Sequence, residues 1–171
     1  MNYVEMPKYH IDPRKTREKL KIITLDQYQQ ILDMTPISHH FYMPLVIAFG
    51  TGMRRGEVCG LQWDMVDLET GSIHVERNMI QLKKKDLPKE KREHPYKIEG
   101  VKTPSSYRTI YIDQYLIDEL HNWRKRQMAN RIKYGEYYDD TNSVCTHENG
   151  MPVTPSSIKS RCTLVSESLG F

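Results

Sequence analysis

The sequence predicts an α+β fold that is mainly helical and carries a small three-stranded antiparallel sheet. Three observations support this class. A nearly unbroken apolar run over 41–49 is too long for a typical strand and is closed by glycines, so it predicts a buried helix. Apolar residues recur at helical spacing through 113–134. Apolar and polar residues alternate over about 72–81, as expected for a strand with one buried face.

The N-terminal part of the chain divides into an arm and the start of a domain. Residues 1–21 are rich in Lys, Arg, Pro and His and lack periodicity, which is typical of a linker or arm. The compact domain is expected to span 22–171. Thr24 and Gln27 have the spacing of a capping box, which predicts a helix over about 25–34.

Three strands and a charged hairpin tip are expected in the middle of the chain. The predicted strands are at 72–81, 96–102 and 107–112. The segment 82–96 is dense in charge and broken by proline, so it cannot bury enough apolar surface to join the core. Between residues 82 and 102, eight Lys and Arg residues face four Asp and Glu residues, which makes this hairpin locally positive.

Further helices are predicted on both sides of these strands. A short helix is expected over 54–61. Asp113 can cap a long helix that ends near Tyr134. The pair Thr154 and Pro155 gives a capping hydroxyl followed by proline at the first helical position, which predicts a last helix that runs to Leu169.

The composition excludes several classes of protein. With 171 residues the chain is long enough for one domain with a core, and no stretch approaches the roughly 18 apolar residues of a membrane span. Its polar beginning is not that of a secretory signal, so we expect a cytoplasmic protein. Three distant cysteines favour buried, reduced thiols over disulfides or a zinc site. A net charge of +3 permits nucleic-acid binding without requiring it.

The first motif with chemical content is TGMRRGEVCGLQW at 51–63. It places Arg54 at a predicted helix start, where a guanidinium and unpaired backbone amides would both suit a phosphate oxygen, and Glu57 follows three residues later. The alternative is that Arg54 and Arg55 are ordinary surface charges and that Glu57 is their helical partner.

The second motif is VKTPSSYRTIYI at 101–112. It places Lys102 at a turn between two predicted strands, and small polar residues and Arg108 follow before an apolar strand.

Together the two motifs resemble those of the tyrosine recombinases of the phage-integrase type, in which an arginine motif precedes a lysine on a hairpin. ITLDQYQQIL at 23–32 resembles the first helix of the family's catalytic domain, and ENGMPVTPSSIKSRC at 148–162 resembles the loop and helix before its third motif. The resemblance covers roughly 22–171, which would therefore be part of such a catalytic domain and share its helical core. It also implies that the linker or arm at 1–21 leads from an N-terminal DNA-binding region.

The resemblance implies site-specific DNA recombination or integration by a phage or mobile-element enzyme in a bacterial cell. A tyrosine would attack a phosphodiester of double-stranded DNA at a recombination site, without a cofactor, ATP or a metal. Arg54 would neutralise the phosphate, Lys102 would protonate the leaving oxygen, and Glu57 would support Arg54. The residues expected to contact DNA are Arg55, Ser105, Ser106 and Arg108. The full-length enzyme would act as a tetramer on DNA, with possible accessory directionality proteins.

The family's later motifs have no match in this sequence. A His-x-x-Arg motif, a further His or Trp, and the tyrosine nucleophile would follow next, so we expect the chain to be a fragment that is inactive alone. His-x-x-Arg strings at 74–77 and 121–124 lie in the wrong context. Tyr134, Tyr137 and Tyr138 are interpreted as aromatic residues of a helix end and a loop.

Two other classes of function stay open at this point. A non-catalytic DNA-binding relative would keep the binding surface and lack cleavage. A metal-dependent nuclease is disfavoured because no acidic cluster accompanies the histidines.

Overall fold

The chain divides into two units, residues 1–34 and 35–171. In this computed structural model the described residues are 23–83, 85, 88–89, 95–101 and 106–170. The predicted arm lies outside these residues, so its boundary near residue 21 stays a prediction.

The first unit contains the predicted N-terminal helix, α2 (Leu25–Asp33). Thr24 and Gln27 form the expected capping box. The Thr24 hydroxyl accepts a hydrogen bond from the Gln27 backbone N–H at 3.3 Å, and the Gln27 side-chain oxygen accepts one from the Thr24 backbone N–H at 3.0 Å. Two of the helix's otherwise unpaired backbone donors are thereby satisfied, which confirms the prediction.

The second unit contains the remaining predicted helices. Asp113 caps the long helix by accepting a hydrogen bond from the Leu116 backbone N–H at 2.9 Å, and Gly170 ends the last helix in a left-handed conformation. The helices are α3 (Tyr42–Thr51), α4 (Arg55–Gly60), α5 (Gln114–Tyr134) and α6 (Pro155–Leu169), with 3-10 turns η1 (Trp63–Met65) and η5 (Gly135–Tyr137). None of the helices among the described residues is long and apolar enough to cross a membrane.

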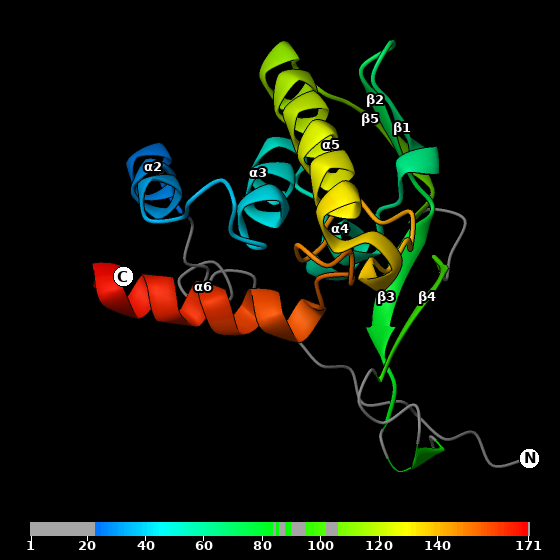
Figure 1. The fold of residues 1–171 in the computed structure, drawn as a ribbon. Coiled ribbons are helices and arrows are strands. Elements are labelled where there is room, and N and C mark those ends of the chain that lie inside the picture. Colours follow the sequence, from blue (N-terminus) through cyan, green and yellow to red (C-terminus); the bar gives the residue numbers. More distant parts are fainter. Residues whose placement is uncertain (1–22, 84, 86–87, 90–94, 102–105, 171) are drawn as a thin grey trace, which may run out of the picture. The chain divides into compact units, whose positions relative to one another are not determined.

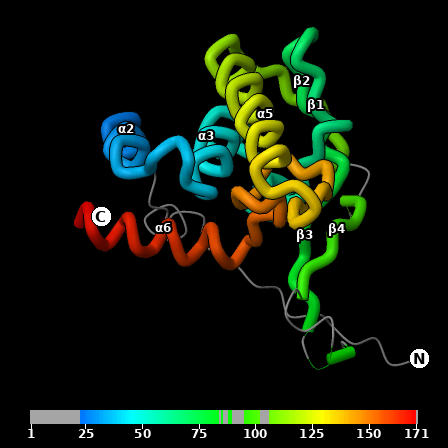
Figure 2. The backbone as a smooth tube through the Cα atoms, viewed as in Figure 1, coloured from blue at the N-terminus to red at the C-terminus, as the bar shows by residue number. Residues whose placement is uncertain are grey.

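Among the described residues, five strands form two antiparallel sheets. They are β1 (Val66–Asp67), β2 (Ser72–Val75), β3 (Arg77–Gln81), β4 (Tyr96–Gly100) and β5 (Arg108–Tyr111). The three-stranded sheet has the order β1-β2-β5, and β3 pairs with β4 in a separate two-stranded ribbon (Figure 2). The described residues therefore include the predicted small three-stranded antiparallel sheet.

The membership of that sheet differs from the prediction. The expected strand at 72–81 is interrupted at Glu76, whose carbonyl accepts a hydrogen bond from the Val101 N–H at 3.0 Å. Residues before Glu76 pair with β5, and those after it pair with β4. Continuous alternation of apolar residues could not reveal this, because the period of side chains does not report which partner a strand takes.

The core of the second unit joins helices and sheet. The helices α3 and α5 lie side by side, with the sheet next to them (Figure 1). Fully buried side chains come from helices, strands and the loop before α6, including Phe41, Met43, Ile47, Leu61, Ile73, Leu116, Leu120, Val144 and Val153. Cys59 and Cys145 are buried free thiols as expected, whereas Cys162 is exposed, contrary to the prediction.

A buried glutamine ties the loop before α6 to α5. The Gln127 side-chain nitrogen donates to the Ser143 carbonyl at 3.1 Å and to the Thr146 hydroxyl at 2.7 Å. Its oxygen accepts the Trp63 indole N–H at 2.8 Å. Since every polar atom of this amide is paired inside the protein, the loop has a fixed position against the helix.

Candidate functional site

The turn between α3 and α4 presents Arg54 to solvent. Gly52 ends α3 with a left-handed φ of 64°, a conformation that glycine adopts without strain. The Thr51 hydroxyl donates to the Ile47 carbonyl at 2.6 Å and accepts from the Met53 N–H at 3.2 Å, which closes the turn. Met53 is buried, and the side chain of Arg54 at the start of α4 is 76% exposed.

Glu57 lies beneath Arg54 and holds it in two ways. One carboxylate oxygen accepts the Arg54 backbone N–H at 2.8 Å, and the other accepts Nη1 of the Arg54 side chain at 3.0 Å. The Glu57 side chain is only 4% exposed. The buried Glu57 carboxylate therefore fixes the exposed guanidinium of Arg54, three residues earlier in the chain.

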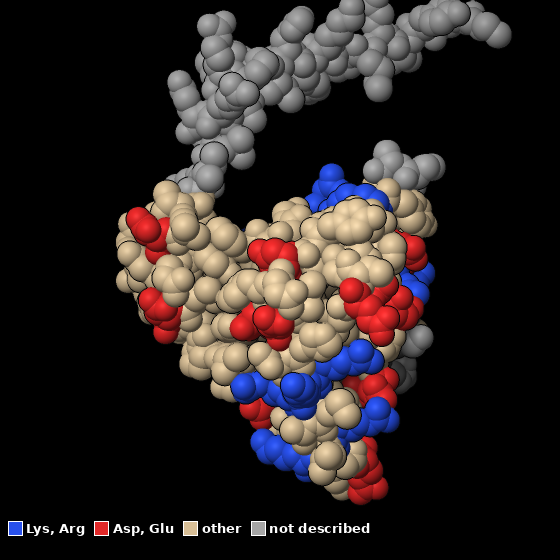
Figure 3. Space-filling model, turned by 90° about the horizontal axis from the view of Figure 1, so that it is seen from above, with Lys and Arg blue, Asp and Glu red and all other residues tan. Residues whose placement is uncertain are grey.

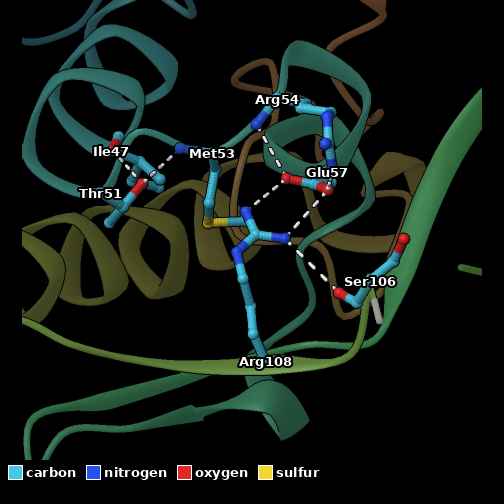
Figure 4. A network of polar contacts seen from close by, with 7 residues as sticks. All are labelled: Ile47, Thr51, Met53, Arg54, Glu57, Ser106 and Arg108. Carbon is cyan, nitrogen blue, oxygen red and sulfur yellow. Dashed lines mark hydrogen bonds and ion pairs between the residues drawn. The ribbon is translucent and has the colours of Figure 1, made fainter. Parts of the chain in front are cut away.

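A second arginine reaches the same carboxylate from the sheet. Arg108, the first residue of β5, donates from Nη2 to Glu57 at 2.7 Å and from Nη1 at 3.1 Å, in a two-bond ion pair. The same Nη1 lies 3.5 Å from the Ser106 carbonyl. Figure 4 shows the Glu57 carboxylate between the two arginines, Arg54 from the helix start and Arg108 from the strand.

These contacts determine the ionisation of Glu57. Hydrogen bonds from Arg108, with those from Arg54, lower the pKa of Glu57 from 4.5 to about 2, although burial opposes the shift. In return, the hydrogen bond to Glu57 raises the pKa of Arg108. Glu57 and Arg108 are therefore both charged at neutral pH.

The helix that begins beside Arg54 lies very close to strand β3. A Cβ atom on Gly60 would lie 2.9 Å from the Met79 backbone nitrogen and 3.0 Å from the backbone of Asn78. One on Gly56 would lie 3.0 Å from the Met79 carbonyl oxygen and would collide with the Asn78 side chain. Glycine at these two positions, one helical turn apart, is what permits α4 to pack directly on the strand.

The structure brings together four of the residues predicted for the site. Arg54, Glu57, Ser106 and Arg108 are linked by the contacts above, and Arg55 is an exposed neighbour at the start of α4. Lys102 and Ser105 lie outside the described residues, so their positions, and the expectation that Lys102 faces the same side as Arg54, stay predictions.

The sequence motifs did not predict the ion pair between Glu57 and Arg108, and Arg108 was expected to contact DNA. A signal was present in the motifs. Glu57 falls on the buried side of a short helix, and a buried carboxylate needs a cationic partner. Because Arg54 was expected to bind phosphate, Arg108 in the second motif was a candidate for that partner.

No group of described residues is arranged to hold a metal ion through three or more His, Cys, Asp or Glu side chains. Three histidine rings lie together outside the candidate site, one pair stacked and the other tilted. The ring of His40 lies 4.3 Å from those of His39 and His147, measured between centroids. Burial and the neighbouring histidines lower the pKa of His40 to about 4, which leaves its ring neutral at pH 7.

Comparison with known proteins places the chain in a family. The model of the phage integrase family matches residues 21–137, and the chain belongs to this family. It is 37% identical over 102 residues to a XerC-like tyrosine recombinase of Caldanaerobacter subterraneus subsp. tengcongensis, covering 58% of this chain and 25% of that protein. It is 25% identical over 113 residues to the ICEBs1 integrase of Bacillus subtilis, covering 66% of this chain and 28% of that protein.

Solved structures agree on the fold. The integrase of the Tn1549 transposon, in complex with transposon right end DNA, superposes with a TM-score of 0.66 at 22% identity, over 88% of this chain and 46% of that one. The XerA recombinase superposes with a TM-score of 0.60 at 15% identity, over 89% of this chain and 44% of that one. The chain therefore has the fold of part of a tyrosine recombinase and spans less than half of these structures.

Proposed function

We propose that the chain is part of a site-specific tyrosine recombinase that binds double-stranded DNA and contributes part of the site for strand cleavage and rejoining. One observation carries the proposal most directly: an exposed arginine is held at a sharp turn by a buried, ionised glutamate. Because a buried carboxylate and a second cation fix this arginine, its geometry is set before any phosphate arrives, which is what stabilisation of a developing charge requires.

The roles of the individual residues follow from their chemistry. Arg54 would bind the non-bridging oxygens of the scissile phosphate, and Glu57 would orient it. Lys102 would give a proton to the leaving oxygen. Arg55, Ser105 and Ser106 would contact the DNA backbone near that phosphate.

The partners are part of the same proposal. They are double-stranded DNA at the ends of a mobile element, further copies of the enzyme in a tetramer, and accessory directionality proteins. Figure 3 shows one face of the molecule, on which Lys and Arg side chains gather toward the lower end of the view and again near its top, with acidic side chains among them. Mixed charge of this kind favours local contacts with phosphates rather than a uniformly positive surface.

Binding to DNA is the first test. The change Arg54→Gln removes one phosphate contact, and Lys125→Gln removes the same charge from an exposed position on α5. Binding of a short fluorescent duplex would be measured by anisotropy over a range of salt concentrations. We expect Arg54→Gln to reduce the slope of log K against log salt by about 1. Equal slopes for Arg54→Gln, Lys125→Gln and the unchanged chain would contradict the assignment of Arg54.

Covalent chemistry is the second test. Arg54 and Lys102 stabilise charge and move a proton but cannot attack phosphorus, so the 171-residue chain alone should form no adduct with a nicked recombination-site duplex. Denaturing gels would detect such an adduct. An adduct that disappeared when Tyr134, Tyr137 or Tyr138 was changed to Phe would overturn this prediction and identify a nucleophile within the chain.

A further inference from the structure

Two arginines from segments far apart in the sequence share one buried carboxylate. We infer that Arg108 acts as a positioning residue, which neutralises Glu57 so that Arg54 keeps its positive charge available for a phosphate. This inference rests on the proposed function, because it assigns the phosphate to Arg54. It replaces the prediction that Arg108 contacts DNA directly.

The charges of the three groups give the first argument. Two guanidinium groups and one carboxylate leave a single net positive charge, and the exposed side chain among them is that of Arg54. If Arg108 were absent, Glu57 and Arg54 would form a neutral pair. An incoming phosphate would then have to compete with Glu57 for the same guanidinium.

The hydrogen bonds give the second argument. Arg108 donates to both oxygens of Glu57 with both of its terminal nitrogens, whereas the Arg54 side chain uses only Nη1 on Glu57. A guanidinium has five N–H donors, so this bond leaves most of those of Arg54 for another anion. Arg108 is only 33% exposed. For Arg108 to reach DNA, both bonds would have to break and leave a buried carboxylate without its main partner.

The position of Arg108 in the chain adds a mechanical role. Arg108 pairs with Val75 across the ladder between β2 and β5, and its side chain also lies against the Ser106 carbonyl. It therefore connects the strand of the second motif, residues 108–111, to the helix start that carries Arg54. Lys102 itself is four residues before Ser106 and lies outside the described residues. The same ion pair thus links the two motifs from which the site is built.

The test compares four variants in the duplex-binding assay. Arg108→Gln lowers the net charge of the three groups to zero, and we expect affinity to fall about tenfold, as for Arg54→Gln. Adding Glu57→Gln to Arg108→Gln restores one positive charge and should recover part of that loss, because Arg54 regains its net charge but loses the carboxylate that orients it. Arg108→Lys keeps the charge with one donor head instead of the fork and should be intermediate. Lys125→Gln is the charge control.

The double variant separates this inference from its rivals. If Arg108 contacted DNA itself, removing Glu57 would not restore binding by Arg108→Gln. If Arg108 only supported the fold, the double variant would be as weak as the single variant or weaker. Either result overturns the inference. Thermal melts of each variant show whether it is folded, and Arg108→Lys preserves the test if Arg108→Gln does not fold.

A measurement without DNA separates the inference from the proposed function. Titration of the Glu57 carboxyl by carbon NMR should show its pKa rising from about 2 toward 4.5 when Arg108 is changed to Gln. An unchanged pKa would refute the coupling even if DNA binds. If the unchanged chain binds no DNA while the pKa moves as expected, the proposed function fails and the coupling between Arg108 and Glu57 stands.

Discussion

Replacing Glu57 with Gln should make the stability of the protein less dependent on pH. The pKa of Glu57 falls from 4.5 to about 2 on folding, because Arg108 and Arg54 donate hydrogen bonds to its ionised form. A shift of this size corresponds to about 3 kcal/mol of folding stability. The side chain is almost fully buried, so solvent screening takes little from this value.

The direction of the effect follows from the sign of the shift. A carboxyl whose pKa is depressed in the folded state contributes its full stabilisation above the unfolded value of 4.5 and loses it as the pH falls toward 2. Glu57→Gln has no such group. The difference in unfolding free energy between the unchanged chain and the variant should therefore narrow by about 1 kcal/mol from pH 7 to pH 4, and by about 2 kcal/mol at pH 3.

Urea denaturation followed by tryptophan fluorescence at each pH gives the two free energies. Comparing two chains at the same pH cancels the contributions of all other titrating groups, including the stacked histidines. A difference that stays constant between pH 7 and pH 3 would refute the argument, because Glu57 would then have the same pKa in the folded and unfolded chains.

Three further predictions concern the packing and the acid stability of the second unit. Gly60→Ala should cost about 1–3 kcal/mol in urea denaturation, because its Cβ meets strand backbone, whereas Gly50→Ala should be nearly neutral because it meets only the tip of a leucine side chain. Gln127→Leu should cost about 2–3 kcal/mol by leaving buried partners unpaired, and Gln114→Leu at an exposed position should cost little. His40→Asn should reduce the loss of stability between pH 6.5 and 4. Because the pKa of His40 is lower in the folded chain than in the unfolded chain, the unfolded chain binds a proton first as the pH falls, and this destabilises the fold. The same fall in unfolding free energy between pH 6.5 and 4 in the variant and the unchanged chain would contradict this prediction.

Much of the fold could be predicted because its helices carry local signals. The capping box at Thr24, the cap at Asp113 and the pair Thr154 and Pro155 each act within one turn of chain, so the sequence contains the whole interaction. The strands were located less completely, because β2 and β3 were predicted as one strand over 72–81 and β1 was not predicted. Their partners could not be predicted, since the break at Glu76 depends on a hydrogen bond from Val101, which is distant in sequence.

In the candidate site, too, the local contact could be predicted and the long-range contact could not. Arg54 and Glu57 are three residues apart, and their contact follows from the start of a helix. The pairing of Glu57 with Arg108 spans 51 residues, and it depends on how β5 is placed beside α4. No local sequence pattern reports a contact over that separation. Only the chemical requirement of a buried carboxylate for a cation pointed to it.

The close approach of α4 to β3 has a consequence for how variants of this protein are interpreted. Gly56 and Gly60 contribute no functional group, yet any added side chain pushes the helix, and with it Arg54, away from the strand. If Arg54 has the role proposed above, a scan of substitutions scored only by recombination would rank both glycines beside Arg54, although neither contributes a side chain to the site. At Gly56 and Gly60 a loss of activity would report that Arg54 has been displaced, not that it has been removed. Measuring the stability of each variant as well distinguishes displacement from removal.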